Sequence, residues 1–343
     1  MPALASTTRR VIVIDAVHDW GDGYAVEKEI WRPLDVALRT ARCGTKVEVI
    51  AAAREADVVV TMGLSTPLTA RVIHALSRCR AIVRYGIGVD NIDVPAATES
   101  GVVVANAPEY CVPEVADHAV SLILALARRV PFFDRSVRAG HWREPIPFAG
   151  PVRRLSTLTL GLIGFGRIAR QVARKMAGFV GTIVAHDPYA GGEVAGDYGV
   201  QMVGLDELMA RADLISVHVP LLPTTYHMIG AAQLARIKPT AFLVNTSRGP
   251  VVDEAALVAA LQAGQIAGAA LDVVESEPLP ANSPLRTLEN VILTPHFACY
   301  SVESTIDLRA SVARSVADVL RGYWPPHVVN RAVQPRFPLK RRR

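Results

Sequence analysis

Cysteines, aromatic residues and long apolar runs are scarce in this sequence of 343 residues. The four cysteines stand far apart without a C-x-x-C pair, so we expect cytoplasmic thiols and neither a zinc site nor a disulfide framework. The longest apolar stretch, residues 119–127, is interrupted by Ser121 and is too short to cross a bilayer, which predicts a buried helix and no membrane partner. Residues 7–10 lead into only a short apolar stretch, so we expect no signal peptide and a cytoplasmic location.

Concentrated charge is also absent, apart from the basic residues at 340–343. The net charge of +5 arises from 37 basic and 32 acidic side chains, and no basic stripe is interleaved with aromatic residues. A short basic run close to prolines is typical of a solvated, frayed segment. We therefore expect no nucleic-acid partner, and the lack of closely spaced histidine or cysteine ligands predicts no bound metal.

Strand-like and helix-like segments alternate along almost the whole chain. A first series of β-branched runs predicts a parallel sheet of about five strands, at residues 11–14, 47–50, 58–61, 81–84 and 102–105. A second series predicts another sheet, at residues 157–163, 182–185, 214–219, 241–245, 266–272 and 291–293, with helical patterns such as 167–179, 205–211 and 253–263 between them. The pattern is that of an α/β chain with two doubly wound parallel-sheet domains.

Two long helical patterns, at residues 112–129 and 304–321, flank the second series of strands. We therefore expect the second domain to be an insertion, with the last helix returning to the first domain. A charged, proline-containing stretch follows the first of these helices and runs to residue 154. The cleft between two such domains is the natural place for a ligand.

A glycine-rich turn follows the first strand of the second series. Its sequence, GFGRIA at residues 164–169, opens a helical pattern. Gly164 permits a tight turn, and Gly166 lets backbone amides approach a pyrophosphate at the helix N-terminus. Asp187 stands about 20 residues further on, at the end of the next strand, where a carboxylate accepts hydrogen bonds from ribose hydroxyls. The predicted contacts in this region are Gly164, Phe165, Gly166, Arg167, Ile168 and Asp187.

The cofactor predicted for this turn is NAD. Asp187 is followed by Pro188 and Tyr189 and by no arginine, so a 2′-phosphate would meet a negative charge without a basic partner. The alternative is a structural βαβ turn in which Asp187 acts only as a capping residue. The matched spacing of glycines and carboxylate favours the dinucleotide site.

Three polar segments follow strands of the second series. They are NTSRG at residues 245–249, DVVESEP at 272–278 and TPH at 294–296. Because the carboxyl ends of parallel strands meet at one edge of a sheet, we expect an arginine, a carboxylate and a histidine to converge there.

These three residue types suit the reduction of a 2-oxo acid. The guanidinium of Arg248 would bind the substrate carboxylate and carbonyl oxygen, and His296 would give the carbonyl oxygen its proton. Glu277 would fix the tautomer of the imidazole and stabilise its charged form. Each residue alone also has an ordinary explanation, as a surface cation, a helix cap or a strand-end histidine. Their joint placement favours catalysis.

The sequence resembles the D-isomer-specific 2-hydroxyacid dehydrogenases over nearly the whole chain after residue 58. This resemblance implies a Rossmann NAD domain at residues 108–304, inserted into a flavodoxin-like substrate domain at 1–107 and 305–343. It also implies a homodimer built on the NAD domains, with residues 131–154 in the subunit contact. The motifs that carry it are GIGVDNIDVPAA at 86–97, GLIGFGRIAR at 161–170, FLVNTSRGPVVDEAAL at 242–257, ALDVVESEPLP at 270–280 and TPH at 294–296.

The resemblance also assigns residues. The family's catalytic arginine, glutamate and acid/base histidine fall on Arg248, Glu277 and His296. Its substrate-carboxylate loop, which acts through backbone amides, falls on residues 85–88. The substrate-binding residues implied are Arg84, Tyr85, Gly86, Ile87, Gly88 and Cys299; further cofactor contacts implied are Val219, Pro220, Thr224, Thr246, Ser247, Asp272 and His296.

Within the family, the chain resembles the branch of the C-terminal-binding-protein corepressors and the phosphoglycerate dehydrogenases. Arg84 and HFACYSVES at residues 296–304 carry this likeness, although Cys299 stands where the corepressor branch usually has tryptophan. Two other functions therefore stay open: an NADH-sensing regulatory protein with little turnover, and a relative acting on formate or phosphite. Formate enzymes normally carry glutamine where this chain has Glu277. The side chain of the substrate is also left open.

Overall fold

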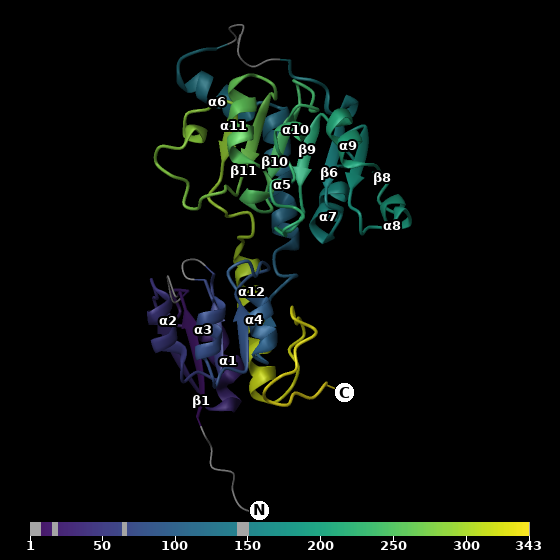
Figure 1. The fold of residues 1–343 in the computed structure, drawn as a ribbon. Coiled ribbons are helices and arrows are strands. Elements are labelled where there is room, and N and C mark those ends of the chain that lie inside the picture. Colours follow the sequence, from purple (N-terminus) through teal and green to yellow (C-terminus); the bar gives the residue numbers. More distant parts are fainter. Residues whose placement is uncertain (1–7, 16–19, 64–66, 143–150, 343) are drawn as a thin grey trace, which may run out of the picture. The chain divides into compact units, whose positions relative to one another are not determined.

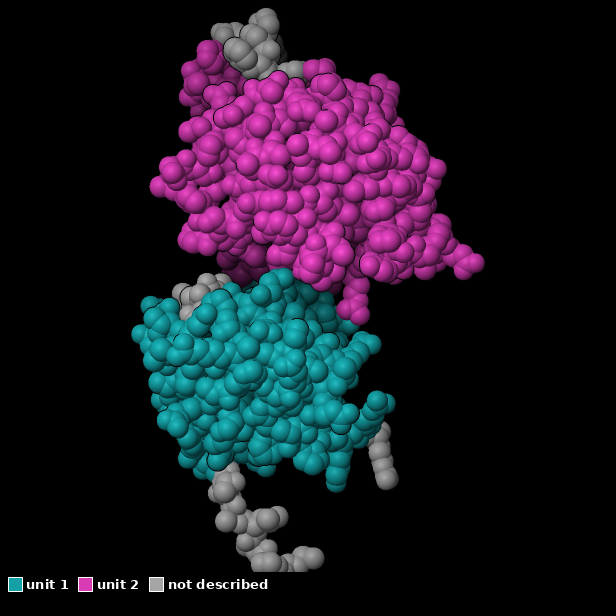
Figure 2. Space-filling view, viewed as in Figure 1, with its two compact units in different colours: residues 1–111, 301–343 teal, residues 112–300 magenta. Residues whose placement is uncertain are grey.

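The structure is a computed structural model that describes residues 8–15, 20–63, 67–142 and 151–342. The chain divides into two units: unit 1 comprises residues 1–111 and 301–343, and unit 2 comprises residues 112–300 (Figure 2). The boundaries predicted for the two domains lay at residues 107 and 305. No helix in the described part of the chain is both long and apolar enough to cross a membrane.

Unit 1 is built on a five-stranded parallel sheet of order β2-β1-β3-β4-β5. Helices α1 and α12 cover one face, and α2, α3 and α4 cover the other (Figure 1). The strands are β1 (Arg9–Ile14), β2 (Val36–Ala41), β3 (Val58–Thr61), β4 (Ala81–Arg84) and β5 (Val103–Ala105). The helices are α1 (Ala25–Trp31), α2 (Lys46–Ala53), α3 (Ala70–Ala75), α4 (Val94–Glu99) and α12 (Val302–Leu320), with a 3-10 turn η1 at Arg32–Leu34.

The strand predicted at residues 47–50 is wrong, because these residues lie in helix α2. The Thr45 side chain accepts a hydrogen bond from the Glu48 amide, and the Glu48 carboxylate accepts one from the Thr45 amide. This capping box starts a helix and outweighs the β-branched composition of the segment. The fifth strand is instead β2, an edge strand. All of its side chains are half-buried or exposed, so the sequence there contains no apolar run that would indicate a strand.

Unit 2 contains a seven-stranded parallel sheet of order β12-β11-β10-β9-β6-β7-β8. The strands are β6 (Thr159–Ile163), β7 (Thr182–His186), β8 (Gln201–Met202), β9 (Leu214–Val217), β10 (Phe242–Asn245), β11 (Gly268–Leu271) and β12 (Val291–Leu293). The helices are α5 (Val112–Ala127), α6 (Val130–Arg138), α7 (Arg167–Met176), α8 (Gly192–Gly196), α9 (Leu205–Arg211), α10 (Ala231–Leu234) and α11 (Glu254–Gln262). Short 3-10 turns are η2 (Leu155–Thr157), η3 (Gly249–Val251) and η4 (Pro284–Arg286).

Side chains on the two faces of this sheet pack against different helices. Helices α5 and α7 cover one face, and α9, α10 and α11 cover the other (Figure 1). The strand order reverses between β6 and β9, which follow one another in the sheet but not in the chain. In open α/β sheets, ligands bind beyond the carboxyl ends of the strands at such a reversal. The predicted sheet is confirmed, although α6 and the two-residue strand β8 were missed. Strands β6, β10 and β11 begin one or two residues later than predicted, β9 and β11 end one or two residues earlier, and β7 ends one residue later.

Candidate active site

The glycine turn after β6 has the backbone geometry that its sequence predicts. Gly164 has φ +89°, and a Cβ atom there would lie 2.9 Å from the carbonyl carbon of His218 at the end of the neighbouring strand. No residue with a side chain fits this position without displacement. Gly166 caps helix α7, and a Cβ atom there would meet no atom within 4 Å. The space beside Gly166 at the start of α7 is therefore open, as the close approach of a pyrophosphate requires.

Asp187 closes the turn from the next strand. One carboxylate oxygen accepts a hydrogen bond from the Phe165 amide at 2.8 Å, and the other accepts one from the Tyr189 amide at 2.8 Å. The carboxylate is half-buried and has further lone pairs for ribose hydroxyls. Asp187 thus orders the glycine turn itself, in addition to the ribose contact predicted for it.

Two buried polar atoms beyond β9 and β10 have no hydrogen-bond partner among the described residues. They are Nε2 of His218 and Oγ1 of Thr246. Burial lowers the pKa of His218 to about 4, so the imidazole is neutral at physiological pH. Unpaired buried polar atoms are costly and point to a ligand that completes them. Their place beyond the strand ends, together with the open turn at Gly166, fits a dinucleotide.

Arg248 is positioned by a buried asparagine that sequence reasoning did not select as a site residue. Asn245 is 1% exposed, and its Oδ1 accepts hydrogen bonds from the amide and hydroxyl of Ser247, at 3.0 and 2.9 Å. Its Nδ2 donates to the carbonyl oxygen of Arg248 at 2.9 Å. The turn that carries Arg248 is therefore fixed from inside the protein. A buried asparagine directly after a strand was the signal that could have revealed this role.

Glu277 and His296 form a direct pair. Oε2 of Glu277 lies 2.7 Å from Nδ1 of His296, and the Val274 amide donates to Oε1 of Glu277 at 3.2 Å. Partial burial favours a raised pKa for the Glu277 carboxyl, but the hydrogen bond and charge of His296 outweigh it. With smaller contributions from Val274 and Arg248, they hold the pKa of Glu277 below its usual value. The structure thus brings Glu277 and His296 together, with Arg248 near enough for its charge to act on Glu277.

Asp272 shapes the turn that carries His296. His296 adopts a left-handed backbone conformation with φ +56°, and its amide donates to the Asp272 carbonyl oxygen at 2.7 Å. The buried Asp272 carboxylate accepts hydrogen bonds from the Thr294 hydroxyl and from the Phe297 and Ala298 amides, at 2.6, 2.9 and 3.0 Å. These bonds stabilise the left-handed conformation, which is unfavourable in free energy for any residue other than glycine. Asp272, predicted as a cofactor contact, organises the turn that carries His296.

The loop predicted to bind the substrate carboxylate lies in unit 1, after β4. Arg84 donates from its guanidinium to the carbonyl oxygens of Gly88, at 3.1 Å, and of Tyr85. Asn106 donates to the Ile87 carbonyl oxygen at 2.7 Å, and the Ala107 amide donates to that of Gly86 at 3.0 Å. Because the carbonyl and amide of a trans peptide point in opposite directions, these bonds direct the Ile87 amide away from the Ala107 amide and the Gly88 amide away from Asn106.

A buried charge network lies under the same loop. The Tyr85 hydroxyl donates to Glu27 at 2.8 Å, and Arg309 of helix α12 donates to the other Glu27 oxygen at 2.7 Å. Glu27 is 0% exposed and Arg309 is 5% exposed. Sequence reasoning missed Glu27, Arg309 and Asn106, since their partners are distant in the chain.

The other predicted residues take varied places. Val219 and Ser247 are half-buried near the strand ends, and Pro220 and Thr224 are exposed in the loop after β9. Cys299 is half-buried in the turn before α12. All four cysteines lie in the described part of the chain and none forms a disulfide. Residues 143–150, part of the predicted subunit contact at 131–154, lie outside the described residues.

The glycine turn, its carboxylate and the adjacent arginine, glutamate and histidine define a nicotinamide-dependent oxidoreductase. A profile of the D-isomer specific 2-hydroxyacid dehydrogenase NAD binding domain matches residues 120–298. The chain belongs to the D-isomer-specific 2-hydroxyacid dehydrogenase family. The predicted family, fold class and NAD cofactor are confirmed.

Individual relatives support the same family assignment. The chain is 42% identical over 292 residues to a glyoxylate reductase of Korarchaeum cryptofilum, covering 84% of this chain and 87% of that one. It is 41% identical to a D-3-phosphoglycerate dehydrogenase of Methanocaldococcus jannaschii, covering 94% of this chain but only 59% of that longer one. The crystal structure of D-lactate dehydrogenase from Aquifex aeolicus, complexed with NAD and lactic acid, matches with a TM-score of 0.81 at 27% identity, over 93% of this chain and 99% of that one.

The protein is therefore an NAD-dependent oxidoreductase acting on 2-hydroxy or 2-oxo carboxylic acids. The phosphoglycerate dehydrogenase relative agrees with one of the two branches that the sequence resembled. The corepressor-like regulatory alternative finds no support in these comparisons.

Proposed function

We propose that the protein reduces a small 2-oxo carboxylate to the D-2-hydroxy acid, with Arg248, Glu277 and His296 as its catalytic residues. The observation that carries this proposal is the 2.7 Å pair between His296 and Glu277, with Arg248 close enough to lower the pKa of Glu277. An acid/base pair and a guanidinium at one sheet edge match the charge that develops during carbonyl reduction. Unit 2 would be the NAD domain and unit 1 the substrate domain.

The proposed reaction divides into binding and proton transfer. The Arg248 guanidinium binds the substrate carboxylate and polarises its carbonyl group through charge-assisted hydrogen bonds. When bound, NADH supplies the hydride that the carbonyl carbon gains.

His296 then donates a proton to the carbonyl oxygen, so carbon gains a hydride, oxygen gains a proton and the product is a hydroxy acid. The Glu277 carboxylate stabilises the imidazolium before the transfer and keeps the imidazole ring oriented after it. In the oxidation direction, His296 takes the proton back from the hydroxyl group.

Kinetics on Arg248 variants test this proposal. We expect Arg248→Ala to lose nearly all reduction of glyoxylate, hydroxypyruvate and pyruvate while its affinity for NADH stays unchanged. Arg248→Lys keeps the charge but not the two-point fork, so it should retain some activity with a raised KM. Reduction at the wild-type rate by Arg248→Ala would place the active site elsewhere.

We also propose a homodimer built on the NAD domains. Helix α6 and the residues after it expose Val130, Val137 and Trp142, at 57%, 47% and 70%. A surface pocket of about 200 Å³ lies beside them, lined partly by α5, α6 and β12. Apolar surface of this kind is typical of an interface. Light scattering should give twice the monomer mass for the wild type and the monomer mass for Val137→Asp.

The proposed location is the cytoplasm, with no nucleic-acid or membrane partner. Its support is the set of four cysteines without a disulfide, which is usual for a reducing compartment. Fractionation of the source cells with an antibody against the protein tests this location.

A further inference from the structure

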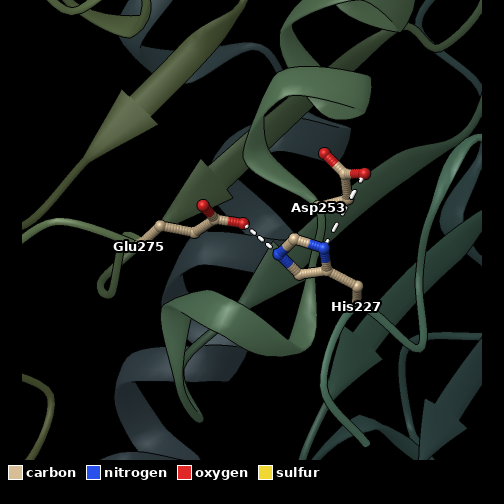
Figure 3. A group of neighbouring side chains, drawn as sticks. All are labelled: His227, Asp253 and Glu275. Atoms are coloured by element: carbon tan, nitrogen blue, oxygen red, sulfur yellow. Dashed lines mark hydrogen bonds and ion pairs between the residues drawn. The ribbon is translucent and has the colours of Figure 1, made fainter.

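His227, in the loop after β9, lies between two carboxylates from other segments of unit 2. Its Nε2 lies 2.6 Å from Oε1 of Glu275, and its Nδ1 lies 3.9 Å from Oδ2 of Asp253 (Figure 3). Ligand atoms of the three residues lie within 4.8 Å of one another, close enough to consider a metal ion. The two carboxylates, however, face opposite nitrogens of the imidazole ring. An ion bound at one nitrogen would therefore reach only the carboxylate on that side, and the other carboxylate would lie on the far side of the ring. The arrangement fits a hydrogen-bonded bridge.

The backbone of His227 is held in place as well. Its amide donates to the Pro250 carbonyl oxygen at 2.8 Å, and the Asp253 amide donates to that of Ile229 at 3.0 Å. His227 has a left-handed conformation with φ +49°, and its ring stacks on Tyr226 at 4.0 Å. A strained conformation persists only where its surroundings fix it. The imidazole is therefore tied to the segment that follows Arg248.

Glu275 ties the same segment to the loop after β11. Its Oε1 also accepts a hydrogen bond from the Glu254 amide at 3.1 Å, and its own amide donates to the Glu254 carboxylate at 3.0 Å. At Gly249 the two segments touch directly, since a Cβ atom there would lie 2.0 Å from the carbonyl carbon of Val274. Residues 249–254 and 272–277 are thus joined by side-chain and backbone contacts.

Both catalytic loops pass through this junction. Arg248 directly precedes Gly249, and Glu277 stands two residues after Glu275. The Val274 amide within the junction also donates to the Glu277 carboxylate. A shift of one segment against the other would change the spacing between the guanidinium and the acid/base pair.

We propose that His227 and Glu275 are positioning residues, whose contact, the His227–Glu275 bridge, fixes the distance between Arg248 and Glu277. The proposal rests on the function proposed above for those two residues. Neither residue is among those proposed to contact substrate or cofactor. Its effect is on alignment, which is expressed in the transition state more than in the binding of either reactant.

Alanine variants test the bridge by a split between kcat and KM. We expect Glu275→Ala and His227→Ala each to lower kcat by about tenfold, because small misplacements of catalytic groups cost at least that much. KM for the 2-oxo acid and the Kd for NADH should stay within about twofold. The double variant should be no worse than either single one, since both remove the same contact.

A conservative variant and a matched control separate positioning from general damage. Glu275→Gln keeps an oxygen that accepts from His227 and from the Glu254 amide, so it should recover most of the lost kcat. Glu207→Ala removes an exposed carboxylate that pairs with Arg211 on helix α9, and it should leave kcat and KM at wild-type values. If the alanine variants fail to fold, Glu254→Ala, which removes the outer contact to Glu275, should lower kcat about threefold.

Wild-type kcat in both alanine variants overturns the proposal. So does a loss confined to KM or to NADH affinity, or an equal loss of kcat in Glu275→Gln.

A measurement that needs no turnover separates this proposal from the proposed function. The NMR signal of the His296 ring proton that faces Glu277 should broaden in Glu275→Ala and persist in Glu275→Gln. If the wild type reduces no 2-oxo acid while this signal responds, the proposed function fails alone. If the wild type is active and neither kcat nor the signal responds, the bridge fails alone.

Discussion

The two units differ in how their predicted substrate and catalytic loops are held in place. Unit 1 places charge beneath its loop, where Glu27, Arg309 and the Tyr85 hydroxyl are almost fully buried. Unit 2 buries Asn245 and Asp272, which bind mainly backbone groups, and leaves Glu277 and His296 with 38% and 45% of their side chains exposed. Buried charge serves rigidity, because it cannot move without losing its partner. The charged pair that is proposed to exchange a proton stays accessible.

The largest expected effect breaks the scaffold of unit 1. Arg309→Met leaves the Glu27 carboxylate buried without its cation, so unfolding of unit 1 should become easier by about 3–5 kcal/mol. Urea titration followed by tryptophan fluorescence measures this change. The double variant Arg309→Met with Glu27→Gln should recover much of the loss. Arg138→Met, in the exposed pair with Asp134, should leave the urea midpoint unchanged. A loss under about 1 kcal/mol in Arg309→Met would contradict the role given to buried charge.

In unit 2 the corresponding change should damage chemistry and not stability. His296→Ala removes the proton donor, so kcat should fall by roughly a hundredfold or more while the NADH affinity is retained. Because 45% of the His296 side chain is exposed and no core residue is removed, the urea midpoint of the variant should stay close to that of the wild type. Stopped-flow reduction of 2-oxo acids and a parallel urea titration check both halves of the prediction. A strongly destabilised but catalytically normal His296→Ala would reverse the comparison.

Cofactor choice should show a smaller effect. The Asp187 carboxylate faces the glycine turn without a following arginine, so NADH should be preferred over NADPH by at least about tenfold, roughly 1.4 kcal/mol. Asp187→Ala should narrow this gap mainly by weakening NADH, since the adenosine ribose hydroxyls of NADH lose their predicted acceptor. Values of kcat/KM with NADH and with NADPH, for the wild type and for Asp187→Ala, test both expectations. Equal efficiency of the wild type with NADH and NADPH would argue against this role.

The smallest effect is a shift along the pH axis. The pKa of Glu277 is lowered, so its negative charge is present above the ordinary carboxyl pKa and is lost only as the pH falls through the lowered value. Glu277→Gln removes that charge at every pH. The protonated form of His296 then loses its stabilising neighbour, and reduction should fade at a lower pH than in the wild type. A pH–rate profile identical to that of the wild type would remove Glu277 from the proton transfer.

The sequence predicted most of the fold because buried parallel strands show as short β-branched runs. Residues 81–84 and 291–293 are strands with the predicted limits. The error at residues 47–50 arose because the same composition is compatible with a helix once Thr45 and Glu48 cap it. Edge strand β2 has no buried run and was not distinguishable from a loop.

Part of the candidate site was predictable because its residues directly follow strands, and the ends of those strands can be recognised in the sequence. Arg248, Glu277 and His296 each follow a strand, and parallel topology brings those ends to one edge. The supporting contacts were not predictable. His227 meets Glu275 through loops 48 residues apart, and Glu27 meets Arg309 across 282 residues. No local pattern encodes such pairs, because their geometry depends on the completed packing of several elements.

The return of helix α12 to unit 1 has a consequence for how the protein is made. At synthesis rates of about 5–20 residues per second, Arg309 leaves the ribosome roughly 15–60 s after Glu27, given their separation of 282 residues. Unit 2 is continuous in sequence and is translated in full during that interval. Glu27 and Trp31 lack their partners on α12 until that helix is synthesised. The Glu27 carboxylate needs Arg309, and the Trp31 indole donates to the Ala313 carbonyl oxygen. On the ribosome, unit 2 is therefore expected to fold first, while the first 111 residues remain a nascent segment suited to chaperone binding.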